Sequence, residues 1–381
     1  MHGPSANRRE AFHGSGPGRG YRIQLVPATH TWLGQPDSAA PEIAVVIPCY
    51  RVVAQVCDVI GRIGPEVSRI YCVDDACPEG SGRHIQANCR DPRVVVLFNE
   101  KNRGVGGATL AGFRRAVEDG AEIVVKIDGD GQMDPTLLVR FASPILAGRA
   151  DYAKGNRFYN PSSLRGMPAH RMLGNAVLSF MTKLSSGYWD IFDPTNGYVA
   201  IHRTALEALR IEKVSERYFF ESDMLYHLNI VRAVVEDVPM DALYGDERTN
   251  LVARRIVFEF TAKHARNFLR RLVYNYYLRD FTIGSIEILV GTALLAFGLV
   301  FGISKWIHSQ ITGETVSAGT AMLAALPVIL GLQLLLSFLA SDIRSMPRVP
   351  LHLRFGPTRA QQLGGEHMAR GAGELRRADR P

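Results

Sequence analysis

Two carboxylates and an amide follow a strand-like run in the first half of the chain. Asp128, Asp130 and Gln132 alternate with two glycines, directly after the largely apolar stretch 122–127. A strand that ends in closely spaced acids places oxygen ligands at the edge of a sheet, and Mg²⁺ or Mn²⁺ binds through such carboxylates together with substrate phosphates. Because Asp and Gly are also ordinary turn residues, the spacing alone leaves a solvated turn open.

The elements that must position these side chains are strands that alternate with helices. Apolar runs at 43–48, 69–75, 93–97 and 122–127 predict four strands, and the apolar residues of 104–119 have helical spacing. This alternation predicts an α/β fold with a mostly parallel sheet and right-handed crossovers.

Three of the four predicted strands end in polar residues. Pro48 and Tyr50 end the first strand, Asp75 the second and Asp128 the fourth. In open parallel sheets, ligands bind outside the carboxyl ends of the strands. We therefore expect these residues to share one edge of the sheet and to form a site for a nucleotide diphosphate.

The polar segments, taken in order, resemble the family 2 glycosyltransferases of GT-A (Rossmann-like) fold, and within that family the polyprenyl-phosphate or dolichyl-phosphate glycosyl synthases. The segments that carry the resemblance are 46–50, 73–75, 102–108, 128–132, 155–157 and 193–198. They cover about residues 43–240 in the family's order. The resemblance implies a GT-A sheet flanked by helices, juxtamembrane amphipathic helices and a C-terminal hairpin of two transmembrane helices.

The resemblance also implies roles for residues on the donor side. The metal set is expected to be Asp128, Asp130 and Gln132, holding Mg²⁺ or Mn²⁺, with the two acids acting in catalysis. The residues expected to bind the nucleotide are Pro48, Tyr50, Asp75, Gly106 and Asp128. Gly106 belongs to a segment that is expected to open a helix packed beneath the nucleotide. Arg51 and Val52 stand where many relatives have Asn-Glu, and because the acid is lost, the choice between GDP and UDP stays open.

The acceptor that the resemblance implies is a polyprenyl phosphate, already anionic at neutral pH because its second pKa is roughly 6. Arg157 and Arg171 are candidate phosphate clamps, since guanidinium forks match phosphate oxygens, although an ion-pair role stays open for both. Asp193 is a candidate catalytic residue that orients the acceptor or acts as a base, with a turn aspartate as the alternative. Arg248 or Arg254 is expected to replace a lysine that relatives carry before their interfacial helices.

Two apolar segments follow the predicted catalytic domain. Residues 283–303 carry one charge, Glu287, and residues 318–340 carry none. Each can cross a hydrocarbon core of roughly 30 Å, which takes about 20 residues. Cations gather before the first segment and after the second, whereas the link holds only Lys305, so the positive-inside rule predicts a catalytic domain on the cytosolic face of the membrane. Whether Glu287 pairs with an arginine or lines a contact in a homo-oligomer stays open.

Charge and cysteine content limit the partners and the cellular compartment that we expect for this chain. The 381 residues carry a formal net charge of +7, and the cations concentrate beside the apolar segments and in the tails, which favours an anionic bilayer over nucleic acid as the partner. The five cysteines lack zinc spacing and are expected to be reduced thiols in a cytosolic domain. The predicted regions are 1–40, a disordered arm and not a signal peptide; 41–247, the GT-A catalytic domain; 248–281, amphipathic interfacial helices; 282–342, two transmembrane helices; and 343–381, a cytosolic tail.

These features predict an inverting, metal-dependent transfer of a monosaccharide from a nucleotide diphosphate sugar to a membrane polyprenyl phosphate. The donor is expected to be of GDP-mannose, UDP-glucose or UDP-GlcNAc type. The alternative is a membrane glycosyltransferase with a hydroxyl acceptor in polysaccharide or glycolipid synthesis, and Glu221 and Asp223 lie where such relatives place a base. A non-catalytic protein that binds a nucleotide sugar is a third possibility, against which the intact acidic segment argues.

Overall fold

The structure is a computed structural model that describes residues 41–159, 169–241 and 253–355. The predicted arm at 1–40, Arg248 and the tail from residue 356 lie outside these described residues. Arg171 and Arg254 belong to described helices, but their side chains are also outside the description.

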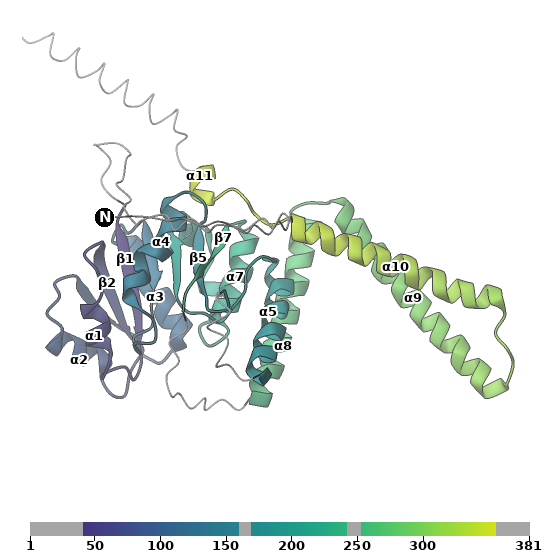
Figure 1. Ribbon diagram of the computed structural model, residues 1–381, viewed down its shortest axis with the longest axis horizontal. Helices are drawn as coiled ribbons and strands as arrows, with labels where there is room; N and C mark the ends of the chain where they lie inside the picture. The colour runs from purple at the N-terminus through teal and green to yellow at the C-terminus, as the bar shows by residue number, and fades with distance from the viewer. Residues whose placement is uncertain (1–40, 160–168, 242–252, 356–381) are drawn as a thin grey trace, which may run out of the picture. The chain divides into compact units, whose positions relative to one another are not determined.

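Seven strands form one sheet in the order β3-β2-β1-β4-β6-β5-β7 (Figure 1). The strands are β1 (Ile43–Cys49), β2 (Val67–Asp74), β3 (Val94–Phe98), β4 (Ile123–Lys126), β5 (Tyr152–Asn156), β6 (Val199–His202) and β7 (Val235–Pro239). Neighbouring strands are parallel except at β6, which runs antiparallel to both β4 and β5. The carboxyl ends of the other strands therefore share one edge of the sheet with the amino end of β6.

The mostly parallel α/β fold expected from the sequence is confirmed. The four predicted strands are β1 to β4, and fully buried residues such as Val45 and Val46 explain why they are continuously apolar, since a parallel strand is covered on both faces. The sequence did not predict β5, β6 and β7 as strands. In β5 the buried Lys154 interrupts the apolar pattern. This lysine is tolerated there because Asp237 on β7 neutralises its ammonium group at 3.3 Å.

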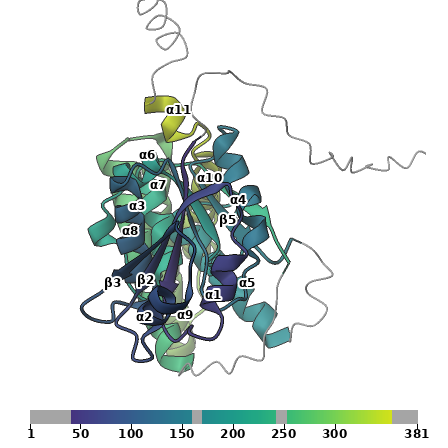
Figure 2. The same ribbon diagram turned by 90° about the vertical axis from the view of Figure 1, so that its left-hand side faces the viewer.

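Helices cover both faces of the sheet (Figures 1 and 2). The helices are α1 (Val56–Gly61), α2 (Ser81–Asn88), α3 (Gly104–Glu118), α4 (Leu138–Leu146), α5 (Ala169–Ser186), α6 (Arg203–Ala208), α7 (Phe220–Ile230), α8 (Ala253–Val273), α9 (Ile283–Thr312), α10 (Ala318–Arg344) and α11 (Leu351–Phe355), with short 3-10 turns at Pro135–Leu137 and Ile211–Lys213 and a π-helical turn at Tyr274–Leu278. One core layer holds Phe113 of α3 and Met224 of α7. The other holds Val56 of α1 and Phe141 of α4.

The helix α8, in the region predicted to hold amphipathic interfacial helices, packs along α5 and α7. Its inner face carries His264, whose Nδ1 lies 2.8 Å from the hydroxyl of Ser185 on α5. Its outer face exposes Phe258 and Leu269. Arg271 is one of the cations that precede the first apolar segment, but it is buried and does not face outward.

Two helices, α9 and α10, are long and apolar enough to cross a membrane. Both are longer than the predicted segments, because the polar residues at their ends continue the helix. They pack closely at glycines: a Cβ added to Gly298 would lie 2.8 Å from the carbonyl oxygen of Ala324. Glu287 accepts a hydrogen bond from the hydroxyl of Ser337 at 2.6 Å, so this acid bridges the two helices of the hairpin.

Polar groups connect this hairpin to the sheet domain. Asp342 near the end of α10 accepts hydrogen bonds from Arg271 of α8, Tyr276 of the π-helical turn and Trp189 after α5. Further along, the amide of Leu351 at the start of α11 donates to the buried carboxylate of Asp151. The chain thus returns from the hairpin to the amino-terminal side of β5.

Candidate active site

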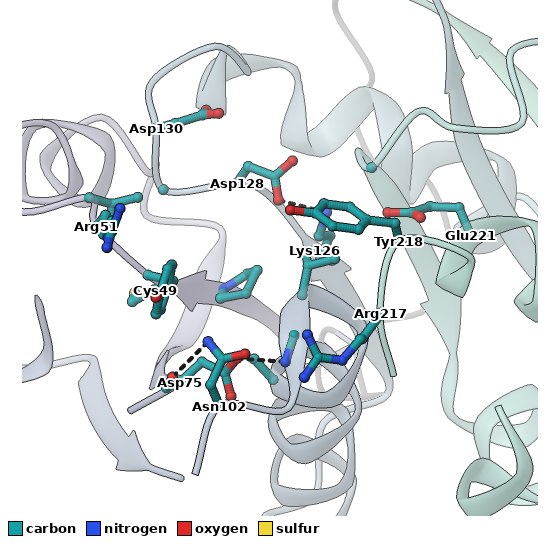
Figure 3. Close-up of a pocket in the computed structure, with 18 of the residues that line it drawn as sticks. Cys49, Arg51, Asp75, Asn102, Lys126, Asp128, Asp130, Arg217, Tyr218 and Glu221 are labelled. Carbon is teal, nitrogen blue, oxygen red and sulfur yellow. Dashed lines mark hydrogen bonds and ion pairs between the residues drawn. The ribbon is translucent and has the colours of Figure 1, made fainter. Parts of the chain in front are cut away.

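A cavity of about 720 Å³ opens at the shared edge of the sheet. It is lined by residues from the ends of β1 and β2, the start of α3, the loop after β4, the segment before β6 and the start of α7. Asp75 and Asn102 gather at one end, and Lys126, Asp128 and Glu221 at the other (Figure 3). The cavity therefore combines a polar end beside α3 with a charged end beside β4.

The acidic segment after β4 forms part of this cavity. Both Asp128 and Asp130 line it, whereas Gln132 is not among its lining residues. Asp128 forms an ion pair of 2.6 Å with Lys126, a lysine that is only 1% exposed. The amide of Gln132 donates to Oδ1 of Asp130 at 3.0 Å, which fixes the turn. The turn also needs a glycine, because Gly131 has φ of +80°.

The two carboxylates have the chemistry that Mg²⁺ or Mn²⁺ requires. Magnesium is usually bound through one or two carboxylates and keeps waters and substrate phosphates as its other ligands. Within the described ranges, no group of three or more His, Cys, Asp or Glu side chains could hold a metal by itself. Asp128 and Asp130 thus fit a cation that arrives with a diphosphate, and Lys126 neutralises Asp128 in the structure as it stands.

Asp75 lines the opposite end of the cavity and closes the amino end of α3. Its carboxylate accepts hydrogen bonds from the amides of Arg103 and Gly104, at 2.9 and 2.7 Å, and from the side chain of Asn99 at 2.8 Å. These contacts resemble an N-cap, in which a carboxylate satisfies the first amides of a helix. The neighbouring Asp74 has a purely local role, since it accepts from the amides of Cys77 and Gly82.

The other predicted nucleotide-binding residues divide between the cavity and the packing behind it. Pro48 and Tyr50 line the cavity, and Tyr50 is 43% exposed, with the guanidinium of Arg51 at 5.5 Å from its ring centroid. Gly106 does not line it. A Cβ at Gly106 would lie 2.7 Å from the carbonyl oxygen of Ser215, so this glycine allows α3 to pack against the segment before α7.

Arg157 and Asp193 lie at the same edge, after β5 and before β6. Asp193 accepts from Nε and Nη2 of Arg157 at 2.7 and 2.8 Å, a two-pronged ion pair. Burial raises the pKa of Asp193, but the hydrogen bonds and charge of Arg157 outweigh burial and keep the pKa below its usual value. Asp193 therefore orients Arg157 in this structure, while its assignment as a catalytic residue stays a prediction.

Several cavity residues were not assigned a role from the sequence. Lys126 is the clearest, and its signal was a charge inside an otherwise apolar strand. Arg217 and Tyr218 also line the cavity, from the segment that packs against α3. Glu221, which the sequence did single out as a base position for the hydroxyl-acceptor alternative, lies at the start of α7. Its pKa is raised to about 7, chiefly by burial, with Lys126 acting in the opposite direction. No local sequence pattern marked Arg217 or Tyr218, because α3 and α7 are brought together only by the fold.

Comparison with known proteins agrees with this geometry. Residues 44–210, within the sheet domain, match the family described as Glycosyl transferase family 2. A UDP-N-acetylglucosamine–dolichyl-phosphate N-acetylglucosaminyltransferase from Methanococcus voltae is 34% identical over 40% of this chain and 61% of its own length. An undecaprenyl-phosphate mannosyltransferase from Micrococcus luteus is 29% identical over 52% of this chain and 82% of its own length.

The match to the Methanococcus protein thus spans about three fifths of that relative. Among solved structures, a glucosyl-3-phosphoglycerate synthase from Mycobacterium tuberculosis with uridine diphosphate aligns over 61% of this chain and 80% of that chain, at 18% identity and a TM-score of 0.44. A score at this level supports no conclusion about function.

Proposed function

We propose that this protein transfers a monosaccharide from a nucleotide diphosphate sugar to a polyprenyl phosphate in a membrane, with inversion at the anomeric carbon. The observation that carries the proposal is the placement of Asp128, Asp130 and Lys126 in one cavity at the carboxyl edge of a family 2 sheet. Two relatives are named for transfer to dolichyl or undecaprenyl phosphate, and α9 and α10 supply the means to reach such a lipid.

On the donor side, Pro48 and Tyr50 wall the base, and Asp75 holds the start of α3 against the ribose end of the cavity. Asp128 and Asp130, with Gln132 as a further candidate ligand, would hold Mg²⁺ or Mn²⁺. When bound, the cation would supply charge stabilisation for the departing nucleoside diphosphate. Before a cation binds, the ion pair with Lys126 holds the carboxylate of Asp128 at the cavity. The positive charge of Lys126 also favours an anionic ligand there.

On the acceptor side, a phosphate monoester needs placement and charge screening more than a base, because it is already anionic at neutral pH. Arg157 is held by Asp193 beside the segment that contributes Thr195 and Gly197 to the cavity. The pair is proposed to orient the acceptor phosphate. Arg171, Arg248 and Arg254 remain proposed phosphate ligands whose side chains lie outside the described part of the chain.

The membrane setting follows from charge. Arg344 ends α10 and Arg348 follows it, and Arg270 and Arg279 precede α9, whereas Lys305 is the cation at the far ends of these helices. By the positive-inside rule, the catalytic domain lies on the cytosolic side, where nucleotide sugars are made available.

One observation favours a hydroxyl acceptor as the second candidate. A base that accepts a hydroxyl proton works best with a pKa near the working pH, and Glu221 lines the cavity with a pKa raised to about 7. With a phosphate acceptor, the same carboxyl would hold the sugar by hydrogen bonds and would not need to change its protonation.

Purified protein in nanodiscs should be incubated with Mn²⁺, a polyprenyl phosphate and, in turn, labelled GDP-mannose, UDP-glucose and UDP-GlcNAc. The proposal expects a lipid-linked monosaccharide from one donor, and loss of transfer with EDTA. A polymer or a glycolipid with a hydroxyl-linked sugar would support the second candidate. Binding of donor without turnover, both with polyprenyl phosphate and with a glycolipid that offers a hydroxyl group, would contradict both.

A further inference from the structure

A second cavity, of about 340 Å³, lies where the apolar hairpin meets the sheet domain. Its lining includes Arg232, Arg279, Thr282, Ser341 and Ser345. Arg232 lies three residues before the start of β7, and the amino end of β7 lies at the opposite edge of the sheet from the first cavity. The two cavities share no lining residue, so this is a separate site.

Positively charged side chains gather at this cavity. Within the described ranges no carboxylate forms a salt bridge with Arg232, and burial first and repulsion by Arg279 next lower the pKa of its guanidinium. Arg354 lies close enough to lower that pKa further. Asp280 also lines the cavity, so the two lining arginines exceed the lining acid by one charge. Two cations held together in this way would be stabilised by a bound anion.

The amino end of α9 lies at the same cavity. Thr282 and Ser285 cap each other's backbone amides, whereas the next amides, of Ile283 and Gly284, have no acceptor within the helix. Both of these residues line the cavity. A helix amino end favours negative charge and suits phosphate oxygens, and here it adds to the two arginines.

An apolar groove adjoins the charged cavity. Its volume is about 440 Å³, and its lining comes from α7, α8 and the π-helical turn, including Ile230, Leu269 and Tyr274. Arg279 connects the two spaces, because its Nη1 donates to the carbonyl oxygen of Ile230 at 3.0 Å and its guanidinium lies 5.6 Å from the Tyr274 ring centroid. A charged pocket beside an apolar groove matches a ligand with a phosphate head and a hydrocarbon chain.

We propose that this second cavity binds the phosphate of an anionic membrane phospholipid, with Arg232 and Arg279 at the phosphate and an acyl chain in the adjoining groove. The lipid, and not free phosphate, is the occupant because the cavity lies at the ends of α9 and α10 that flank the sheet domain, where lipid headgroups would be found. The inference rests on the membrane location in the proposed function, but not on the transfer reaction.

The test is native mass spectrometry of the full chain in detergent, titrated with phosphatidylglycerol or phosphatidylcholine. Arg232→Gln/Arg279→Gln should weaken the first phosphatidylglycerol binding step by at least about tenfold, the scale of one lost charge-assisted hydrogen bond. Phosphatidylcholine binding should not change. Arg140→Gln, on an exposed position of α4, is the matched control and should bind phosphatidylglycerol like the unaltered protein.

Equal phosphatidylglycerol affinity in the double variant and the unaltered protein would overturn the proposal, as would an equal loss in the control. Displacement of the lipid by millimolar inorganic phosphate would overturn the choice of a lipid over a free anion. If the double variant does not fold, Arg279→Gln alone carries the test, because this side chain is exposed. Sugar transfer is measured in parallel: unaltered transfer beside unaltered lipid binding would reject this site and leave the proposed function standing.

Discussion

The ion pair between Arg271 and Asp342 should be the contact that holds the apolar hairpin to the sheet domain. Its atoms lie 2.6 and 3.0 Å apart, and both side chains are at most 2% exposed. Removal of one partner leaves the other charge buried without compensation, which costs about 3–5 kcal/mol. We therefore expect Asp342→Leu and Arg271→Leu each to destabilise the protein by about this amount.

The double variant Arg271→Leu/Asp342→Leu should be less damaging than the sum of the single variants. No uncompensated charge remains, although Trp189 and Tyr276 lose the acceptor that they share at 2.9 and 2.7 Å. Unsatisfied donors of this kind cost about 1–3 kcal/mol. The cycle of the four proteins should thus show a coupling energy of about 2 kcal/mol or more between the two residues.

Thermal unfolding in nanodiscs, followed by tryptophan fluorescence, measures the effect. At about 2 °C per kcal/mol for a chain of this size, each single variant should lower Tm by about 6–10 °C. Arg344→Leu, at an exposed position of the same helix, is the control and should change Tm by less than about 2 °C. Single variants that behave like this control, or effects that simply add in the double variant, would refute the reasoning.

Three further predictions concern the site and the fold. Asp130→Ala should abolish sugar transfer while the protein stays folded and in the membrane fraction; near-normal turnover would remove the metal assignment. Asp193→Asn should keep the fold, since Asn tolerates the φ of +53° found there, but should raise the KM for the lipid acceptor more than for the donor; equal effects would count against an acceptor role. His202 has its pKa lowered from 6.5 to about 4, first by burial and next by His352, so between these values the unfolded chain binds more protons. Stability should therefore fall as pH drops from 6.5 toward 4, and His202→Asn should flatten the curve of Tm against pH. The flattening should be partial, because the pKa of His264 is lowered to about 4 as well and that residue remains. A curve identical to that of the unaltered protein would contradict this.

The sequence was sufficient for the features that depend on local pattern. Continuous apolar runs identified β1 to β4, since strands covered on both faces need apolar residues at every position. The uninterrupted apolar content of α9 and α10 identified two candidate spans in the same way. The acids at strand ends, Asp75 and Asp128, could also be placed on one edge, because parallel strands end on the same side.

The tertiary structure decided the partners of the charged residues, which no spacing encodes. Lys126 is the last residue of β4 and neutralises Asp128 in the loop that follows. Lys154 is tolerated in β5 because it pairs with Asp237 on β7. Arg271 belongs by sequence to a basic juxtamembrane stretch, yet the packing of α8 buries it against Asp342, 71 residues further along the chain. A hydrophobic pattern reports which residues avoid water, whereas the identity of a buried ion's partner depends on which distant segments the fold brings into contact.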